Sequence, residues 1–148
     1  MITTNKLQLT VGGLLALATV FAAPATAAPS SPEPLLPNES GEFYFHTHTD
    51  RTLCYVTEDE VGCSEGGQFL NIPIQPGDGM HPNGVRLNAD GTVEYLVGDL
   101  GGNPETELDY MTYTAVGWTI EAVENGTRFT NERTGRGMVV GNDWAQTF

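Results

Sequence analysis

The chain is predicted to fold as an all-β domain, either a small antiparallel sandwich or a barrel-like meander of hairpins. From residue 41 onward, no segment repeats its apolar residues with the period of a helix. Short runs rich in aromatic and β-branched residues recur instead, and some of them alternate with polar residues. Glycine and proline separate these runs, as is typical of short strands joined by turns.

A secretory signal peptide is predicted at the start of the chain. Lys6 precedes an apolar run over residues 7–23, and the small residues Ala25 and Ala27 follow. This order matches the charged start, apolar helix and small-residue cleavage site of exported proteins, so we expect cleavage before Ala28. The run is too short and too rich in Gly, Ala and Thr for a membrane span, so no stable membrane insertion is expected after cleavage.

A proline-rich leader is predicted over residues 28–41. Four prolines in this segment should keep it out of regular ladders and favour an extended, mobile chain. The leader would then tether a single domain over residues 42–148, which is long enough to bury one core.

The first strand is expected over residues 43–49, and a disulfide-closed hairpin follows it. Cys54 and Cys63 are the only cysteines, and an even number in an exported chain indicates a disulfide. A tight turn between them places Cys54 opposite Cys63 and Val56 opposite Val61. A metal-binding cysteine pair is the alternative, but two thiolates without nearby partners make a poor zinc site.

The remaining strands are predicted from turn signals. The expected elements are a hairpin of residues 85–88 and 92–97, a hairpin of residues 118–124 and 127–131 joined by Asn125-Gly126, and a last strand over residues 135–140, with Trp144 and Phe148 at the sheet edge. Glycine and proline predict loops over residues 66–84 and 98–109. A short strand over residues 68–74 is possible within the first of these, at a sheet edge because it contains Pro73.

The net charge of the chain limits the classes of partner that it would bind. After cleavage there is no lysine, and five arginines face nineteen acidic residues, which gives a net charge of −14 with neutral histidines. Such a field repels nucleic acid and anionic membranes and favours cationic partners or metal ions. Solubility alone is a sufficient reason for the same composition.

Several short motifs resemble small exported actinobacterial β-domains that contain a disulfide. The motifs are Phe45–Val56, Val61-Gly62-Cys63, Leu108-Asp109-Tyr110, Gly117-Trp118, Gly126–Asn131 and Thr134–Met138. The chain departs from that pattern because a second cysteine pair near the last hairpin is missing. The resemblance implies an extracellular compartment and a β-fold, but no activity, because that family has no established one.

His46, His48 and Asp50 form the strongest candidate for a metal site. Residues two apart on a strand share a face, and two imidazoles with a carboxylate suit Zn²⁺ or a similar divalent ion. Asp78 and His81 in the glycine-rich loop could add ligands.

A plain structural role explains the same histidines. Phe43 and Phe45 have the opposite parity and would take the core, which leaves the histidines on an outer polar face. Arg51 also stands where a metallohydrolase signature would continue with another histidine. On this interpretation no cofactor is expected.

The other candidates for chemistry are weaker. The acidic loop over residues 99–109 could offer oxygen ligands to Ca²⁺, but its spacing is not that of an EF-hand. Both cysteines are used by the bridge, and Ser64, the only serine after residue 41, has no nucleophile-elbow context. A carbohydrate or partner platform could use certain aromatic residues, although core packing is the favoured use for them: Tyr110, Tyr113, Trp118 and Trp144.

These observations together favour an exported, non-catalytic domain rather than an enzyme. It would be secreted, extracellular or associated with the cell wall, and would act by binding a partner or ligand that the sequence does not identify. The alternatives are a divalent-metal-binding protein built on the His-x-His-x-Asp strand and a hydrolase of cell-envelope polymers.

Overall fold

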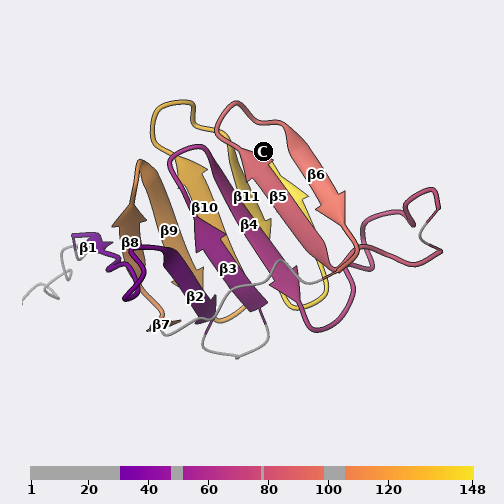
Figure 1. The fold of residues 1–148 in the computed structure, drawn as a ribbon, viewed down its shortest axis with the longest axis horizontal. Helices are drawn as coiled ribbons and strands as arrows, with labels where there is room; N and C mark the ends of the chain where they lie inside the picture. Colours follow the sequence, from indigo (N-terminus) through magenta and orange to yellow (C-terminus); the bar gives the residue numbers. More distant parts are fainter. Residues whose placement is uncertain (1–30, 48–51, 78, 99–105) are drawn as a thin grey trace, which may run out of the picture.

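Two six-stranded sheets packed face to face make up the domain (Figure 1). The computed structural model describes residues 31–47, 52–77, 79–98 and 106–148. Within these residues, the first sheet has the strand order β1 (Glu33–Pro34), β8 (Thr112–Ala115), β9 (Trp118–Val123), β10 (Gly126–Asn131), β11 (Gly137–Val140) and β12 (Ala145–Thr147). The second has the order β6 (Val93–Leu96), β5 (Gly84–Asn88), β4 (Glu60–Glu65), β3 (Thr52–Val56), β2 (Phe43–Thr47) and β7 (Thr106–Leu108).

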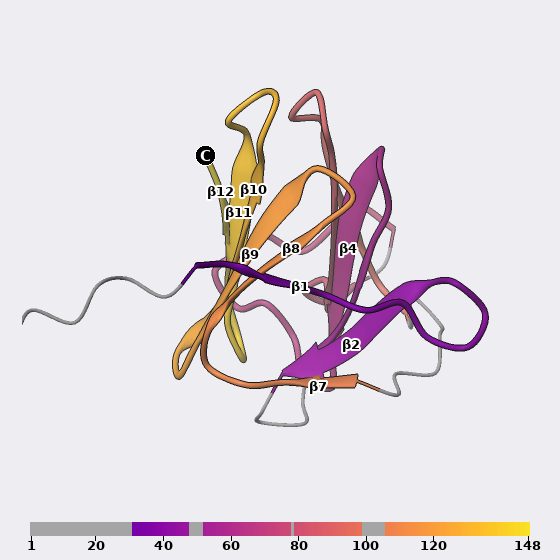
Figure 2. The ribbon, with the colours of Figure 1, turned by 90° about the vertical axis from the view of Figure 1, so that its left-hand side faces the viewer.

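The predicted all-β class is confirmed, and the architecture is a sandwich rather than a closed barrel (Figure 2). Most neighbouring strands are antiparallel, as the hairpin signals indicate. Each sheet also has one parallel pair at an edge, β1 with β8 and β2 with β7, which no hairpin signal predicts. No helix in the described residues is both long and apolar enough to cross a membrane.

The core lies between the two sheets. Phe45 on β2 and Phe129 on β10 approach each other across it, with ring centroids 6.1 Å apart. Trp118 is fully buried and donates its indole N–H to the carbonyl oxygen of Thr57 at 3.0 Å, which ties β9 to the turn between β3 and β4. Each sheet therefore contributes large inward side chains from alternate strand positions.

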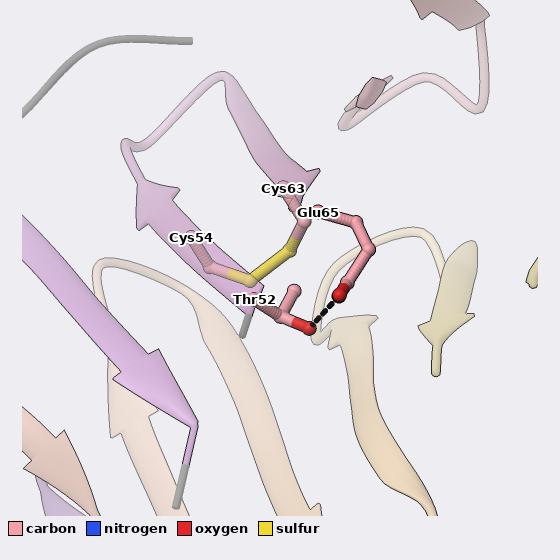
Figure 3. Close-up of a disulfide and its surroundings, with 4 residues drawn as sticks. All are labelled: Thr52, Cys54, Cys63 and Glu65. Carbon is pink, nitrogen blue, oxygen red and sulfur yellow. Dashed lines mark hydrogen bonds between the residues drawn. A yellow bond between two sulfur atoms is a disulfide. The ribbon is translucent and has the colours of Figure 1, made fainter. Parts of the chain in front are cut away.

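The predicted cysteine hairpin is confirmed in its register and its bond. Cys54 lies opposite Cys63 with the Cα atoms 4.1 Å apart, the disulfide joins them, and Val56 pairs with Val61. Figure 3 shows a polar pair beside the disulfide, in which the Thr52 hydroxyl donates to a carboxylate oxygen of Glu65 at 2.5 Å. The inward face of this hairpin thus carries an apolar pair, a covalent pair and a hydrogen-bonded pair in succession.

The strand predicted over residues 68–74 is wrong. The backbone amides of this segment bond to separate partners, Phe69 to the Pro82 carbonyl and Leu70 to the Asp143 carbonyl. The Asn71 side chain donates a hydrogen bond to the Ala145 carbonyl and accepts one from the Ala145 amide. These are the two bonds that the backbone of a strand beside β12 would otherwise make. The segment is an irregular loop, because the groups to which it is hydrogen-bonded lie on different segments and not along one neighbouring strand.

The two later hairpins are confirmed, with one change at a turn. In the β9–β10 hairpin, Val123 pairs with Gly126, so the central turn residues are Glu124 and Asn125 rather than Asn125-Gly126. Gly126 is still required, because a Cβ there would lie 2.5 Å from the Val140 carbonyl oxygen of β11. The glycine therefore serves a close backbone approach as well as the turn.

The expectation that the leader stays outside every ladder is wrong for residues 33–35. Glu33 and Pro34 pair with β8, Leu35 donates its amide to the Thr114 carbonyl at 2.9 Å, and the Leu35 side chain is buried. Pro34 is tolerated because β1 is an edge strand with a neighbour on one side only. Ordered structure therefore begins before residue 42.

Three further strands were not predicted. They are β7, at the end of the predicted loop over residues 98–109, β8, in an unassigned stretch, and β12, after the predicted last strand. All three are short, and β7 and β12 are edge strands with three residues each. β7 and β12 each have a single neighbour, and β7 pairs with a strand distant in sequence, which local patterns do not reveal. β8 is different, because the two-residue turn Val116-Gly117 joins it directly to β9, a local signal that the prediction did not use.

Candidate functional site

A row of directly opposed residues crosses the outer face of the second sheet. It runs from β2 to β6 and consists of Tyr44, Tyr55, Gly62, Arg86 and Glu94, each paired with the next on the neighbouring strand. The disulfide cysteines lie next to two of these positions and point into the core. Because strand side chains alternate between faces, the row points outward.

A cavity of about 440 Å³ opens beside the tyrosine end of this row, and we name it the tyrosine groove. It is lined by Gly41, Glu42, Phe43, Tyr44, Tyr55, Val56, Thr57, Glu60, Arg86 and Val116. The groove therefore joins the outer face of the second sheet to the β8–β9 turn of the first. Its volume lies within the range of ligand pockets in proteins.

Gly62 fixes the position of the Tyr55 ring. A Cβ atom at Gly62 would overlap the ring of Tyr55, so only glycine lets the ring lie against the strand. On its other side Tyr44 packs at a centroid distance of 5.7 Å with the rings tilted by 41°. Tyr55 is consequently 9% exposed although it stands on the outer face of the sheet.

A polar network holds the hydroxyl end of the same ring. Tyr55 donates to a Glu60 carboxylate oxygen at 2.5 Å and accepts from Nε of Arg86 at 3.0 Å. The same Nε lies 3.5 Å from Oε1 of Glu60, and Nη1 of Arg86 lies 3.2 Å from a carboxylate oxygen of Glu94. The charged groups thus position one another and the ring between them.

The environment raises the pKa of Tyr55 to about 12. Burial is the main cause, because the anion would lose solvation, and the hydrogen bond to Glu60 adds to it. Arg86 acts in the opposite direction but does not offset these two effects. At neutral pH the phenol is therefore a fixed donor to Glu60 and a poor base or nucleophile.

High pH is expected to destabilise the fold through Tyr55. An ordinary tyrosine has a pKa of 10.0, so the unfolded chain loses its proton first, and the stabilisation present below pH 10 disappears as pH approaches 12. The expected loss between about pH 9 and about pH 11.5 is about 1–2 kcal/mol. Urea unfolding of wild type and Tyr55→Phe at both pH values measures it.

The comparison with Tyr55→Phe isolates this effect. Residues 28–148 contain no lysine, so in a protein made of these residues only tyrosines and the α-amino group change charge near this pH range. The stability advantage of wild type over the variant should shrink at the higher pH. An advantage that stays constant would contradict the raised pKa.

Backbone strain occurs at the rim of the groove. Val116 has a φ of 40°, and it is followed by Gly117 with a φ of 84°, as a two-residue turn between β8 and β9 requires. A β-branched residue in the left-handed region is rare and costs on the order of 1–3 kcal/mol. The turn is thus held in place by its surroundings where it lines the groove.

The predicted metal site falls largely outside the described residues. His46 is described and lies half-buried on β2, but His48, Asp50 and Asp78 lie outside the described residues. In the described part of the chain, no cluster of three potential metal ligands is present. His81 contacts the Ile72 carbonyl oxygen through Nδ1 at 2.5 Å. The metal site built on His46, His48 and Asp50 therefore stays a prediction.

Some of the other predicted candidate residues also lie outside the described residues, and the rest can be placed in the fold. Most of the acidic loop, residues 99–105, lies outside the described residues. Core packing is confirmed for Tyr113 and Trp118, while Trp144 is half-buried and Tyr110 is exposed. The outer face of the second sheet presents a different aromatic pair, Tyr44 with Tyr55.

Sequence reasoning did not find the tyrosine groove, although one signal was available. The predicted register of Cys54 with Cys63 also places Tyr55 opposite Gly62. An aromatic residue facing a glycine across a strand pair indicates a ring lying against the neighbouring strand. The contributions of Arg86 and Val116 depend on contacts between distant segments and carry no local signal.

No protein-family model matches this chain, and neither a curated protein nor a solved structure is detectably similar to it. The resemblance to exported actinobacterial domains therefore stays a prediction. The function has to be argued from the geometry of the domain itself.

Proposed function

We propose that this protein is an exported, non-catalytic domain that acts at or outside the cell envelope by binding a partner in the tyrosine groove. The observation that carries the proposal is the groove itself. It combines an aromatic pair, of which Tyr55 is buried and Tyr44 half-buried, with charged side chains that are already held in place. Aromatic residues and arginine in such settings supply much of the energy of binding sites.

The geometry favours binding over catalysis. Each polar group of the network is bonded to another member, and the Tyr55 phenol stays protonated at neutral pH. A catalytic base or nucleophile would instead need a pKa near the working pH. Groups that are fixed but unreactive suit recognition, because little side-chain freedom is lost when a ligand binds.

Two observations support an extracellular location. The start of the chain has the pattern of a signal peptide. The disulfide between Cys54 and Cys63 is compatible with an oxidising compartment. Secretion, or attachment to the outside of the cell, is thus the setting in which we propose that the groove works.

Capture by immobilised protein tests the binding role. Residues 28–148 contain no lysine, so amine coupling attaches the domain through its N-terminus alone and leaves the groove unmodified. Wild type should retain a component of the culture supernatant or cell-wall fraction of the source cells. Tyr44→Ala should retain at least about fivefold less, because a packed aromatic contact is removed.

Tyr110→Ala is the matched control. Tyr110 is 49% exposed and does not line the groove, so the variant loses an exposed tyrosine elsewhere and should capture as much as wild type. Equal capture by all three proteins would contradict the proposed function.

A further inference from the structure

We propose that the ligand of the tyrosine groove is a basic polypeptide segment that places a lysine side chain in it. This inference rests on the proposed function and names the class of its ligand. It is carried by the charges around the groove, the arrangement of its aromatic residues, and the composition of the chain.

The charges around the groove are negative in sum. Glu42 and Glu60 line it together with a single basic residue, Arg86. The guanidinium of Arg86 already lies within 3.5 Å of Glu60 and 3.2 Å of Glu94, so its charge is offset twice. An incoming cation therefore meets more carboxylate than guanidinium charge.

The aromatic residues suit the same ligand. A tyrosine face attracts an ammonium group through the ring quadrupole. Tyr55 is covered by Gly62 on one side and by Tyr44 on the other, so the face open to a ligand is that of the partly buried Tyr44. The Tyr44 and Tyr55 rings are tilted by 41°, so they do not stack fully on each other. Phe43 and Val116 also line the groove and are only partly buried, so they add apolar surface against which the methylene stem of a lysine can pack.

The composition of the chain supports a basic partner and excludes self-association by this route. The formal net charge of −14 on residues 28–148 attracts cationic polypeptides over long distances. Residues 28–148 contain no lysine, so a second copy of the processed chain cannot supply the side chain that we propose. The lysine must come from another protein.

Titration calorimetry with defined probes tests the ligand class. The probes are an acetylated decapeptide of alternating lysine and alanine, its glutamate counterpart, and a neutral chitin oligosaccharide. We expect binding of the lysine peptide only. Tyr44→Ala should raise its Kd about fivefold, and Glu42→Gln about threefold to fivefold.

Glu124→Gln is the control for bulk charge. Glu124 lies in the exposed β9–β10 turn of the other sheet, and the substitution removes the same charge as Glu42→Gln. We expect it to change the Kd less than about twofold, because exposed charges beyond a Debye length are screened. An equal effect of the two substitutions would overturn the proposal, since binding would then report only total charge.

Two outcomes separate this proposal from the proposed function. If the oligosaccharide binds in a Tyr44-dependent manner and the lysine peptide does not, the ligand class is wrong while the groove is still a binding site. The lysine peptide should also displace the component captured by the immobilised domain. If Tyr44-dependent capture resists such displacement, only the ligand class is overturned.

Discussion

Replacing Cys54 or Cys63 with serine is expected to lower the free energy of unfolding by about 2–4 kcal/mol. The disulfide closes the β3–β4 hairpin, so its loss gives conformational freedom back to the unfolded chain. Both cysteines are also fully buried, and a serine hydroxyl in the core would lack the solvation it has in water. The two effects act in the same direction.

Urea unfolding of the two serine variants, with wild type under oxidising and reducing conditions, measures this loss. The free energy of unfolding of reduced wild type should lie between that of the oxidised protein and those of the variants, because reduced wild type loses the crosslink but keeps sulfur in the core. Free thiols detected by labelling of the unreduced protein would contradict the bridge.

Gly62→Ala is expected to destabilise the domain by about 2–3 kcal/mol and to abolish binding in the tyrosine groove. The new methyl group would overlap the Tyr55 ring, which must then leave its place against β4. The displaced ring would lose its hydrogen bonds with Glu60 and Arg86. Urea unfolding measures the first effect, and capture by the immobilised domain measures the second.

A double-mutant cycle tests the cause. In the background of Tyr55→Ala, the ring is absent, and Gly62→Ala should become neutral or even stabilise by about 0.5 kcal/mol, because alanine suits a strand better than glycine. Destabilisation of equal size in both backgrounds would mean that Gly62 is needed for its backbone and not for Tyr55.

The parts of the fold that the sequence predicts correctly are those with local signals. The cysteine hairpin is an example, because alternation and a short turn fix its register. The hairpin before Asn131 follows from its turn residues, although the turn itself begins one residue earlier than predicted. Local chemistry thus predicts which strands pair through tight turns.

Most of the parts that sequence reasoning misses depend on distant contacts, and the exception is β8, which forms a tight hairpin with β9. Leu35 is buried because its segment pairs with the edge of β8, a strand almost eighty residues later in the chain. No pattern in the proline-rich sequence around Leu35 indicates this pairing. The parallel pairing of β7 with β2 likewise joins segments about sixty residues apart. The tyrosine groove combines both situations, since Tyr55 and Gly62 are local partners while Arg86 and Val116 come from elsewhere in the chain.

The strand order has a practical consequence for display and fusion. The first and last strands of the described chain, β1 and β12, are the two opposite edges of one sheet, whereas most residues that line the groove belong to the other sheet. A reporter, a surface anchor or a second domain fused beyond either strand would extend from the first sheet. The domain can therefore be attached at either end, or at both, while the tyrosine groove stays open to the surrounding medium.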